Sequence, residues 1–104
     1  MLQEIKHTAV FYYEHHYEKK GVYQVVVRFP DLLEIGYPGF TSGDTLEEAI
    51  ENARDVLAVL VEFAEEDGIA LPDPTPIEKI QIDRNFNLEA KPFRIIVDQV
   101  TIYL

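Results

Sequence analysis

The chain contains no cysteine among its 104 residues, and this absence excludes several kinds of chemistry. Disulfide bonds, thiolate metal sites and cysteine nucleophiles all require the missing residue. A reducing compartment is the simplest setting for such a chain, so we expect a cytoplasmic protein. Long apolar runs are also lacking, because the longest one, residues 56–61, is about a third of the ~18 residues that a membrane helix needs. The first residues lack the basic-then-apolar order of a secretory signal.

Basic side chains are scarce as well. Nine Lys and Arg stand against nineteen Asp and Glu, which gives a formal charge of −10. Proteins gain much of their affinity for nucleic acids by neutralising phosphates, so we expect no direct binding of DNA or RNA. The negative electrostatic field of such a chain attracts a basic protein and accelerates its association with the chain. Solubility alone also explains an acidic surface. The charge therefore argues against one class of partner without choosing another.

Motifs for catalysis or cofactor binding are missing too: there is no phosphate-binding glycine loop, dinucleotide fingerprint or nucleophile triad. His15 and His16 are adjacent and His7 stands apart, which is not metal-ligand spacing, so we expect an exposed hairpin tip at 15–16. Asp31 and Asp44 flank one turn region and form a third, minor alternative, a metal-dependent hydrolase. Both are also explained by the turn and by the helix that follows. The sequence predicts a binding protein without metal or cofactor.

Two segments show the alternation of β-branched and aromatic residues that is typical of strands, residues 7–14 and 21–29. A polar stretch between them predicts an antiparallel hairpin with a long loop. Pro30 cannot donate a ladder hydrogen bond and ends the second strand. After a turn region rich in glycine, we expect a short third strand near 37–42.

A long amphipathic helix follows. Thr45 and Glu48 have the spacing of a capping box, and Gly68 is suited to a left-handed cap, so the helix should end near Asp67. The predicted core stripe consists of Leu46, Ile50, Ala53, Leu57, Leu60 and Ala64. The second half of the helix is apolar beyond this stripe, and further protein, from the same fold or a second copy, should cover the surplus.

The last third of the chain contributes strands. The prolines within 71–76 predict a stiff connector, and 77–83 is expected to form a short strand. Residues 93–104 carry apolar side chains on both faces, so this final strand should be either central or covered by a partner chain. The sequence predicts one α+β domain with the order β-β-β-α-β and one long helix packed on a mostly antiparallel sheet. Residues 1–76 form its core and 77–104 complete it.

Short motifs lie in a fixed order around the predicted hairpin and helix. They are Phe29-Pro30-Asp31-Leu32, Pro38-Gly39, Gly43-Asp44-Thr45-Leu46-Glu47-Glu48-Ala49, Asn52-Ala53-Arg54 and Leu71-Pro72-Asp73-Pro74. In this order, over roughly residues 8–75, the chain resembles the HicB-like antitoxin family. The resemblance implies a partial ribonuclease-H-like fold without the catalytic acids of the nuclease. It also implies a partner, a small basic HicA-type toxin that cleaves mRNA and is neutralised when its active site is covered.

The chain departs from the family pattern in two places. Leu33-Glu34-Ile35-Gly36 looks like an insertion and should reshape the surface that faces a partner. Many members append a DNA-binding helix-turn-helix or ribbon-helix-helix domain, whereas 77–104 shows neither a second amphipathic helix nor a basic cluster. We therefore expect no direct operator binding by these residues.

The resemblance gives two alternative assignments of surface residues. If the chain binds a toxin, the expected contacts are Asp31, Glu34, Tyr37 and Phe40, with the acidic Glu65, Glu66 and Asp67 in reserve. If it is instead a stand-alone homo-oligomer with a structural or regulatory role, the expected interface is Val59, Phe63, Ile96 and Ile102.

Overall fold

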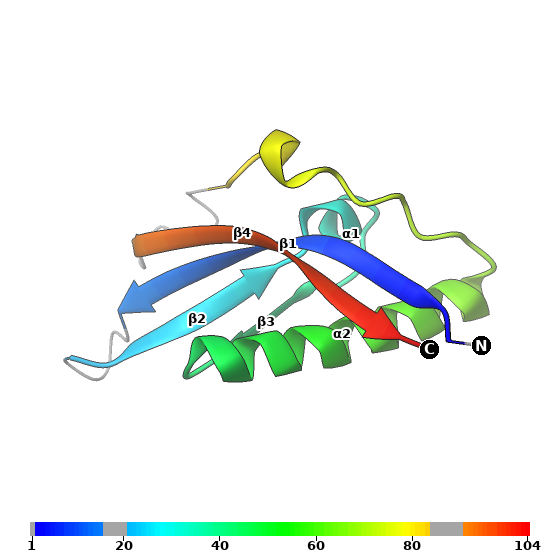
Figure 1. Cartoon of the computed structure of the whole chain (residues 1–104). Coiled ribbons are helices and arrows are strands. Elements are labelled where there is room, and N and C mark those ends of the chain that lie inside the picture. Colours follow the sequence, from blue (N-terminus) through cyan, green and yellow to red (C-terminus); the bar gives the residue numbers. More distant parts are fainter. Residues whose placement is uncertain (1, 16–20, 84–90) are drawn as a thin grey trace.

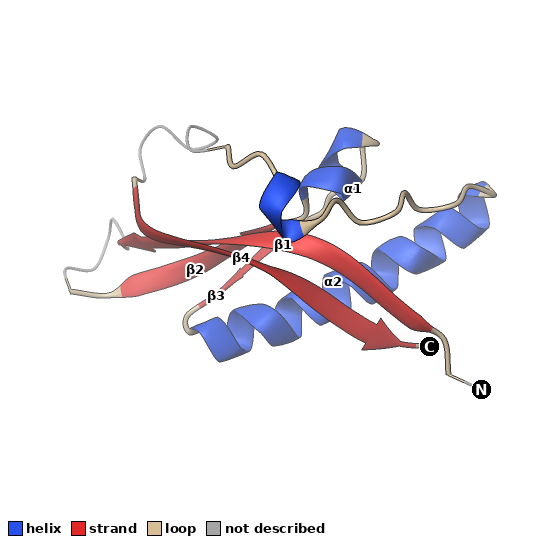
Figure 2. Cartoon of the chain, turned by 45° about the horizontal axis from the view of Figure 1, so that its top comes forward, coloured by secondary structure: helices blue, strands red, loops and turns tan. Residues whose placement is uncertain are grey.

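The computed structural model describes residues 2–15, 21–83 and 91–104. Its elements, in chain order, are β1 (Glu4–His15), β2 (Tyr23–Arg28), α1 (Pro30–Glu34), β3 (Phe40–Gly43), α2 (Leu46–Asp67), the 3₁₀ turn η1 (Ile77–Lys79) and β4 (Pro92–Tyr103). The strands form one antiparallel sheet in the order β3-β2-β1-β4. Helix α2 lies across one face of this sheet, while α1 and η1 lie on the other side (Figures 1 and 2). The predicted α+β fold with one long helix is confirmed.

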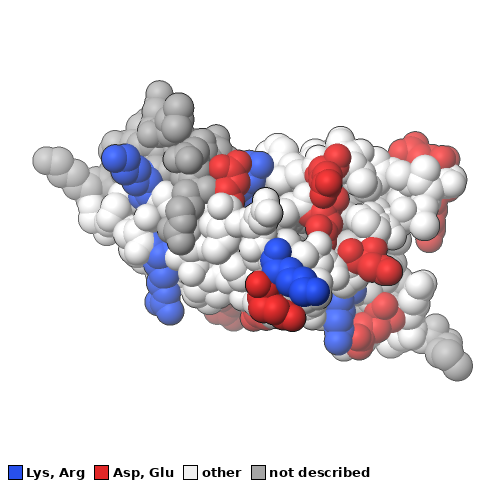
Figure 3. All heavy atoms as spheres, turned by 90° about the horizontal axis from the view of Figure 1, so that it is seen from above, with Lys and Arg blue, Asp and Glu red and all other residues white. Residues whose placement is uncertain are grey.

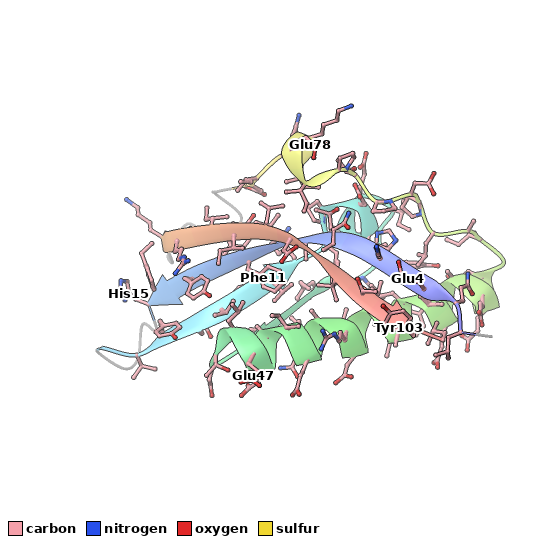
Figure 4. The ribbon with its side chains drawn as sticks, in the orientation of Figure 1. Glu4, Phe11, His15, Glu47, Glu78 and Tyr103 are labelled. Carbon is pink, nitrogen blue, oxygen red and sulfur yellow. The ribbon has the colours of Figure 1, made fainter. Side chains whose placement is uncertain are left out.

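Strand β1 is the centre of the structure because β2 and β4 pair with its two edges. The hairpin predicted from the alternation is present, with a register that runs from Val10↔Arg28 to His15↔Tyr23. One face of β1 contributes Phe11 to the core shared with α2, and the ring lies between sheet and helix in Figure 4. Tyr12, on the other face, lies beside α1 and residues 81–83, which follow η1. Both faces of β1 are therefore covered, which explains its unbroken run of buried residues from His7 to Glu14.

The buried stripe of α2 packs on the sheet as its periodicity predicted. Its buried residues are Ala49, Ala53, Leu57, Leu60, Val61 and Ala64. Leu46 and Ile50, which were predicted to be in the stripe, are half-buried and pack against the same core. Each fully buried large apolar side chain contributes about 1.5–3 kcal/mol, so this stripe is the main attachment of helix to sheet.

Both ends of α2 are where the capping residues placed them. The Thr45 hydroxyl accepts a hydrogen bond from the Glu48 amide at 3.1 Å, and Glu48 Oε1 accepts one from the Asp44 amide at 3.4 Å. At the other end Gly68 has φ +69°, and its N–H donates to the carbonyls of Ala64 and Glu65. These contacts satisfy backbone groups that the helix itself leaves unpaired.

Several local predictions were wrong. Residues 30–34, expected to turn, form the short helix α1 with Pro30 in its first turn. Residues 77–83 contain the 3₁₀ turn η1 and no strand. Strand β4 lies at the edge of the sheet, so the first of its two predicted alternatives, a central strand, is wrong, and cover by a partner chain stays a prediction. In the described part of the chain, no helix is both long and apolar enough to cross a membrane.

Candidate partner-binding surface

An apolar groove runs along the exposed flank of α2. It has a volume of about 320 Å³ and is lined by Pro38, Asp55, Val56, Val59, Leu60 and Phe63. Val59 and Phe63 remain 44% and 40% exposed. Five of the six lining residues are apolar, so the flank offers contiguous apolar contact area bordered by polar side chains, a combination typical of interaction sites.

Tyr37 connects this groove to the end of α2. Its phenol donates a hydrogen bond of 2.7 Å to Asp67 Oδ2. Its ring meets that of Phe63 edge-on, with centroids 6.4 Å apart and planes at 69°. Desolvation, with the hydrogen bond to Asp67, raises the pKa of Tyr37 above its ordinary 10.0, so the phenol, which is protonated at neutral pH in any case, stays a donor in more alkaline solution as well. The loop between α1 and β3 thereby fixes one wall of the groove.

Acidic side chains follow the same helix. Helix α2 carries one basic residue, Arg54, and eight acidic ones, Glu47, Glu48, Glu51, Asp55, Glu62, Glu65, Glu66 and Asp67. Four of them, at successive spacings of seven, seven and four, fall on one side of the helix next to the groove, and we call Glu48, Asp55, Glu62 and Glu66 the acidic stripe. Glu47, in contrast, points away from the sheet (Figure 4). On the molecular face opposite α2, Lys and Arg lie among Asp and Glu (Figure 3).

The structure brings together only some of the predicted contact residues. Tyr37, Val59, Phe63 and Asp67, which came from the two alternative assignments, share one surface. Phe40 is exposed but pairs with Arg28, which lies beside Tyr12 and not beside α2.

The remaining predicted acidic contacts are divided between other places. Glu34 is exposed beside Thr75 and Lys79, in a depression on the side of the sheet away from α2. Glu65 borders a different depression, together with His7 and Leu71. Glu66 belongs to the acidic stripe.

Asp31 makes contacts within the fold. Its two carboxylate oxygens accept hydrogen bonds from the amide and the hydroxyl of Thr75, both at 2.7 Å. The hydroxyl of Thr8 donates to the carbonyl of Thr75. Asp31 therefore anchors the connector at 71–76, which explains why this residue type stands after Pro30. Within 2–15, 21–83 and 91–104, no three His, Asp or Glu side chains gather as a metal site.

The predicted oligomer residues on β4, unlike those on α2, are covered within the single chain. Ile102 is buried in the core of the single chain and Ile96 is half-buried against that core, so the prediction that Ile102 is free for a second copy is wrong. Both pack on the helix-facing side of the sheet, where α2 covers them. The Gln99 amide donates to Asp98 Oδ1 at 2.7 Å, so a side chain occupies one amide of this edge strand.

Sequence reasoning missed two buried titratable groups on β1. His7 is 3% exposed and Glu14 is 1% exposed, and among the described residues His7 Nδ1 and Glu14 Oε2 have no hydrogen-bond partner. Burial lowers the pKa of His7, against the opposing effects of Asp31 and Asp73. Burial also raises the pKa of Glu14, partly offset by a hydrogen bond from Gln24. The sequence did hold one signal of their burial. Both residues lie inside the alternating pattern of a strand that is covered on both faces.

An aromatic cluster at the far end of the hairpin was also missed. The rings of His15 and Phe93 lie 4.6 Å apart, and those of Tyr23 and Phe93 lie 6.1 Å apart. The Arg94 guanidinium lies 5.4 Å from the centre of the Tyr13 ring. His15 is exposed as predicted, whereas His16 lies outside the described residues. The cluster packs the start of β4 against the hairpin.

Comparison with known proteins gives a consistent result. The family described as HicB_like antitoxin of bacterial toxin-antitoxin system matches residues 12–100. Antitoxin HicB 1 of Photorhabdus laumondii subsp. laumondii is 38% identical over 65 residues, which is 62% of this chain. The chain spans about two fifths of that relative, since the match covers 39% of its length. A toxin–antitoxin complex from Streptococcus pneumoniae contains a similar fold, with a TM-score of 0.71 and 21% identity over 95% of this chain and 69% of the other.

Proposed function

The chain belongs to the HicB-like antitoxin family of bacterial toxin–antitoxin systems, and we propose that it neutralises a small basic HicA-type toxin that cleaves mRNA. The observation that carries this proposal for the chain itself is the flank of α2, where exposed apolar side chains border an acidic stripe. A surface that combines apolar contact area with one sign of charge suits a partner of opposite charge.

The mechanism follows from charge and shape. A toxin that binds RNA needs a cationic surface for the phosphates, and an anionic protein competes for that surface. The apolar groove adds contact area that a free phosphate backbone cannot match. Inhibition then requires no chemistry by the antitoxin, only that the toxin's active site is covered. The proposal also keeps this chain in the cytoplasm, where mRNA is found, and assigns no nucleic-acid binding to the described residues.

The test uses the chain and a purified HicA-type toxin, for which the first candidate is any short basic protein encoded in an adjacent reading frame. We expect the two purified proteins to elute as one complex, and we expect RNA cleavage to fall as antitoxin is added. Raising the salt concentration should weaken the complex, since surface charges are screened within about 8 Å at physiological ionic strength. Two separate species at micromolar concentration, with undiminished cleavage, contradict the proposal.

A second candidate, a homo-oligomer without a toxin, is favoured by the position of β4. This strand of 12 residues lies at the edge of the sheet, and a long edge strand can pair with another chain. The Asp98 carboxylate bound to the Gln99 amide opposes such pairing. Light scattering on the wild type and on Asp98→Thr decides: a stable dimer of the wild type supports this candidate, whereas self-association only in the variant opposes it.

A further inference from the structure

We propose that the groove beside α2 seats a large apolar side chain of the toxin, and that Lys or Arg lies next to this side chain on the toxin. The inference rests on the proposed function and specifies how the partner is recognised. It assigns Val59 and Phe63 to the toxin rather than to a second copy of this chain.

The groove is prepared for an apolar anchor before any partner arrives. Phe63 is held edge-on by Tyr37, and Tyr37 is fixed in turn by its hydrogen bond to Asp67. Val59 stands one helical turn before Phe63, and Pro38 forms a rigid opposite wall. Side chains that are already fixed lose little conformational entropy on binding, which is a property of interface hot spots.

The charges beside the groove decide between the possible occupants. The acidic stripe borders the groove, and Asp55 is both part of the stripe and part of the lining. A toxin segment that seats its apolar anchor in the groove therefore places the residues next to that anchor against carboxylates. Lys or Arg at those positions gains attraction, whereas Asp or Glu is repelled.

A second copy of this chain does not meet that requirement with the same face. Arg54 is the one basic residue of α2, and its helical position is on the side of the helix away from the groove. Two such faces packed together bring acidic side chains near one another on a chain of charge −10. Like charges in an interface are unfavourable, so a basic partner fits this surface better than a copy does.

The first experiment removes the apolar anchor site. In a titration of the purified HicA-type toxin, we expect Phe63→Ala to weaken binding by about tenfold or more, mainly through faster dissociation. Ile77→Ala is the matched control, because Ile77 is 41% exposed and lies on η1, on the opposite side of the sheet. It should change affinity by less than about twofold. Val59→Ala is a second test of the same groove if Phe63→Ala unfolds.

The second experiment removes charge. The triple variant Asp55→Asn/Glu62→Gln/Glu66→Gln should slow association about tenfold at low salt and reduce the salt dependence of binding. The control triple variant, Glu47→Gln/Glu51→Gln/Glu65→Gln, removes the same charge from the other exposed side of α2 and should slow association clearly less.

The outcomes distinguish a failure of the proposed docking site from a failure of the proposed antitoxin function. If the toxin binds the wild type, Phe63→Ala and Val59→Ala with equal affinity, the groove is not the docking site, while the antitoxin function stands. If the two triple variants slow association equally, the proposal that Lys or Arg flanks the apolar anchor is wrong. A wild-type dimer that Phe63→Ala converts to a monomer assigns the groove to a second copy. If the wild type binds no toxin, the proposed function itself fails.

Discussion

Asp31 accepts two hydrogen bonds from Thr75, one from the backbone amide and one from the side-chain hydroxyl, across 44 positions of sequence. Both residues are partly buried, and the Thr75 carbonyl accepts a third hydrogen bond, from the Thr8 hydroxyl. The connector at 71–76 contains three prolines and makes no regular backbone ladder. Asp31 therefore supplies part of what holds this segment on the sheet, opposite α2.

The first prediction concerns this anchor. Asp31→Ala removes both acceptors, and we expect the free energy of unfolding to fall by about 2–3 kcal/mol, because hydrogen bonds to charged groups are strong and the Thr75 donors lose their partner. Urea denaturation measures the change. Glu34→Ala, an exposed neighbour, should stay within about 0.5 kcal/mol. If the carboxylate contacts the toxin instead, stability is unchanged and affinity falls.

The second prediction concerns His7. Burial lowers its pKa below the ordinary 6.5, so the folded protein binds fewer protons than the unfolded chain as the pH falls through that value. Stability contributed by neutral His7 is therefore present above pH 6.5 and lost as the solution becomes more acidic. Between pH 7.5 and 5.5 we expect a loss of about 1 kcal/mol that is absent in His7→Gln.

Urea unfolding at several pH values checks this prediction, and the difference between wild type and His7→Gln isolates the contribution of the one residue. His15→Gln is the matched control, since His15 is exposed on the same strand. Equal pH profiles for the wild type and His7→Gln contradict the prediction.

The third prediction concerns Glu14 and has the opposite sign. Burial raises its pKa above the ordinary 4.5, so stability from its protonated form is present below pH 4.5 and lost as the pH rises through the folded-state pKa. Glu14→Gln cannot ionise, so it should be more stable than the wild type at pH 8, by about 1 kcal/mol for a buried carboxylate oxygen that finds no hydrogen-bond partner in the described part of the chain. The advantage should disappear near pH 4, and Glu78→Gln should show none. A variant that is less stable at pH 8 shows that the carboxylate is satisfied.

The sequence was a good guide wherever a signal is local. Alternation located the hairpin, and Thr45, Glu48 and Gly68 fixed both ends of α2, because capping depends on residues within one turn. Helix α1 was missed because its five residues are too few to show a period of 3.6. Whether β4 is central or at an edge stayed open because strand order depends on pairing between distant segments, which side-chain alternation does not encode.

In the candidate site, too, features with a local sequence signal could be predicted, whereas contacts between distant segments could not. The surplus apolar width of α2 indicated that residues beyond the core stripe need cover from the same fold or a second copy, and the fold leaves Val59 and Phe63 partly exposed. The sequence assigned Tyr37 and Phe63 to different partners, and only the tertiary fold shows their rings in contact. The carboxylate of Asp31 seemed available because its partner, Thr75, is far away along the chain.

The last prediction concerns the junction of β3 and α2. A Cβ atom added at Gly43 meets backbone atoms of the first helical turn, the nearest being the Ala49 nitrogen at 2.5 Å. Backbone cannot rotate away as a side chain can, so Gly43→Ala must push β3 and α2 apart. We expect a loss of about 3 kcal/mol or more in the free energy of unfolding.

Gly68→Ala is the comparison that separates steric conflict from backbone strain. A Cβ at Gly68 meets no atom within 4 Å, but φ is +69°, so the cost should be the left-handed strain of about 1–2 kcal/mol. Thermal and urea unfolding of both variants give the order directly. A cost at Gly43 no larger than that at Gly68 means that strand and helix can separate easily. In that case their junction does not set the position of Pro38 against α2, and the groove wall must depend on Tyr37 and Asp67 instead.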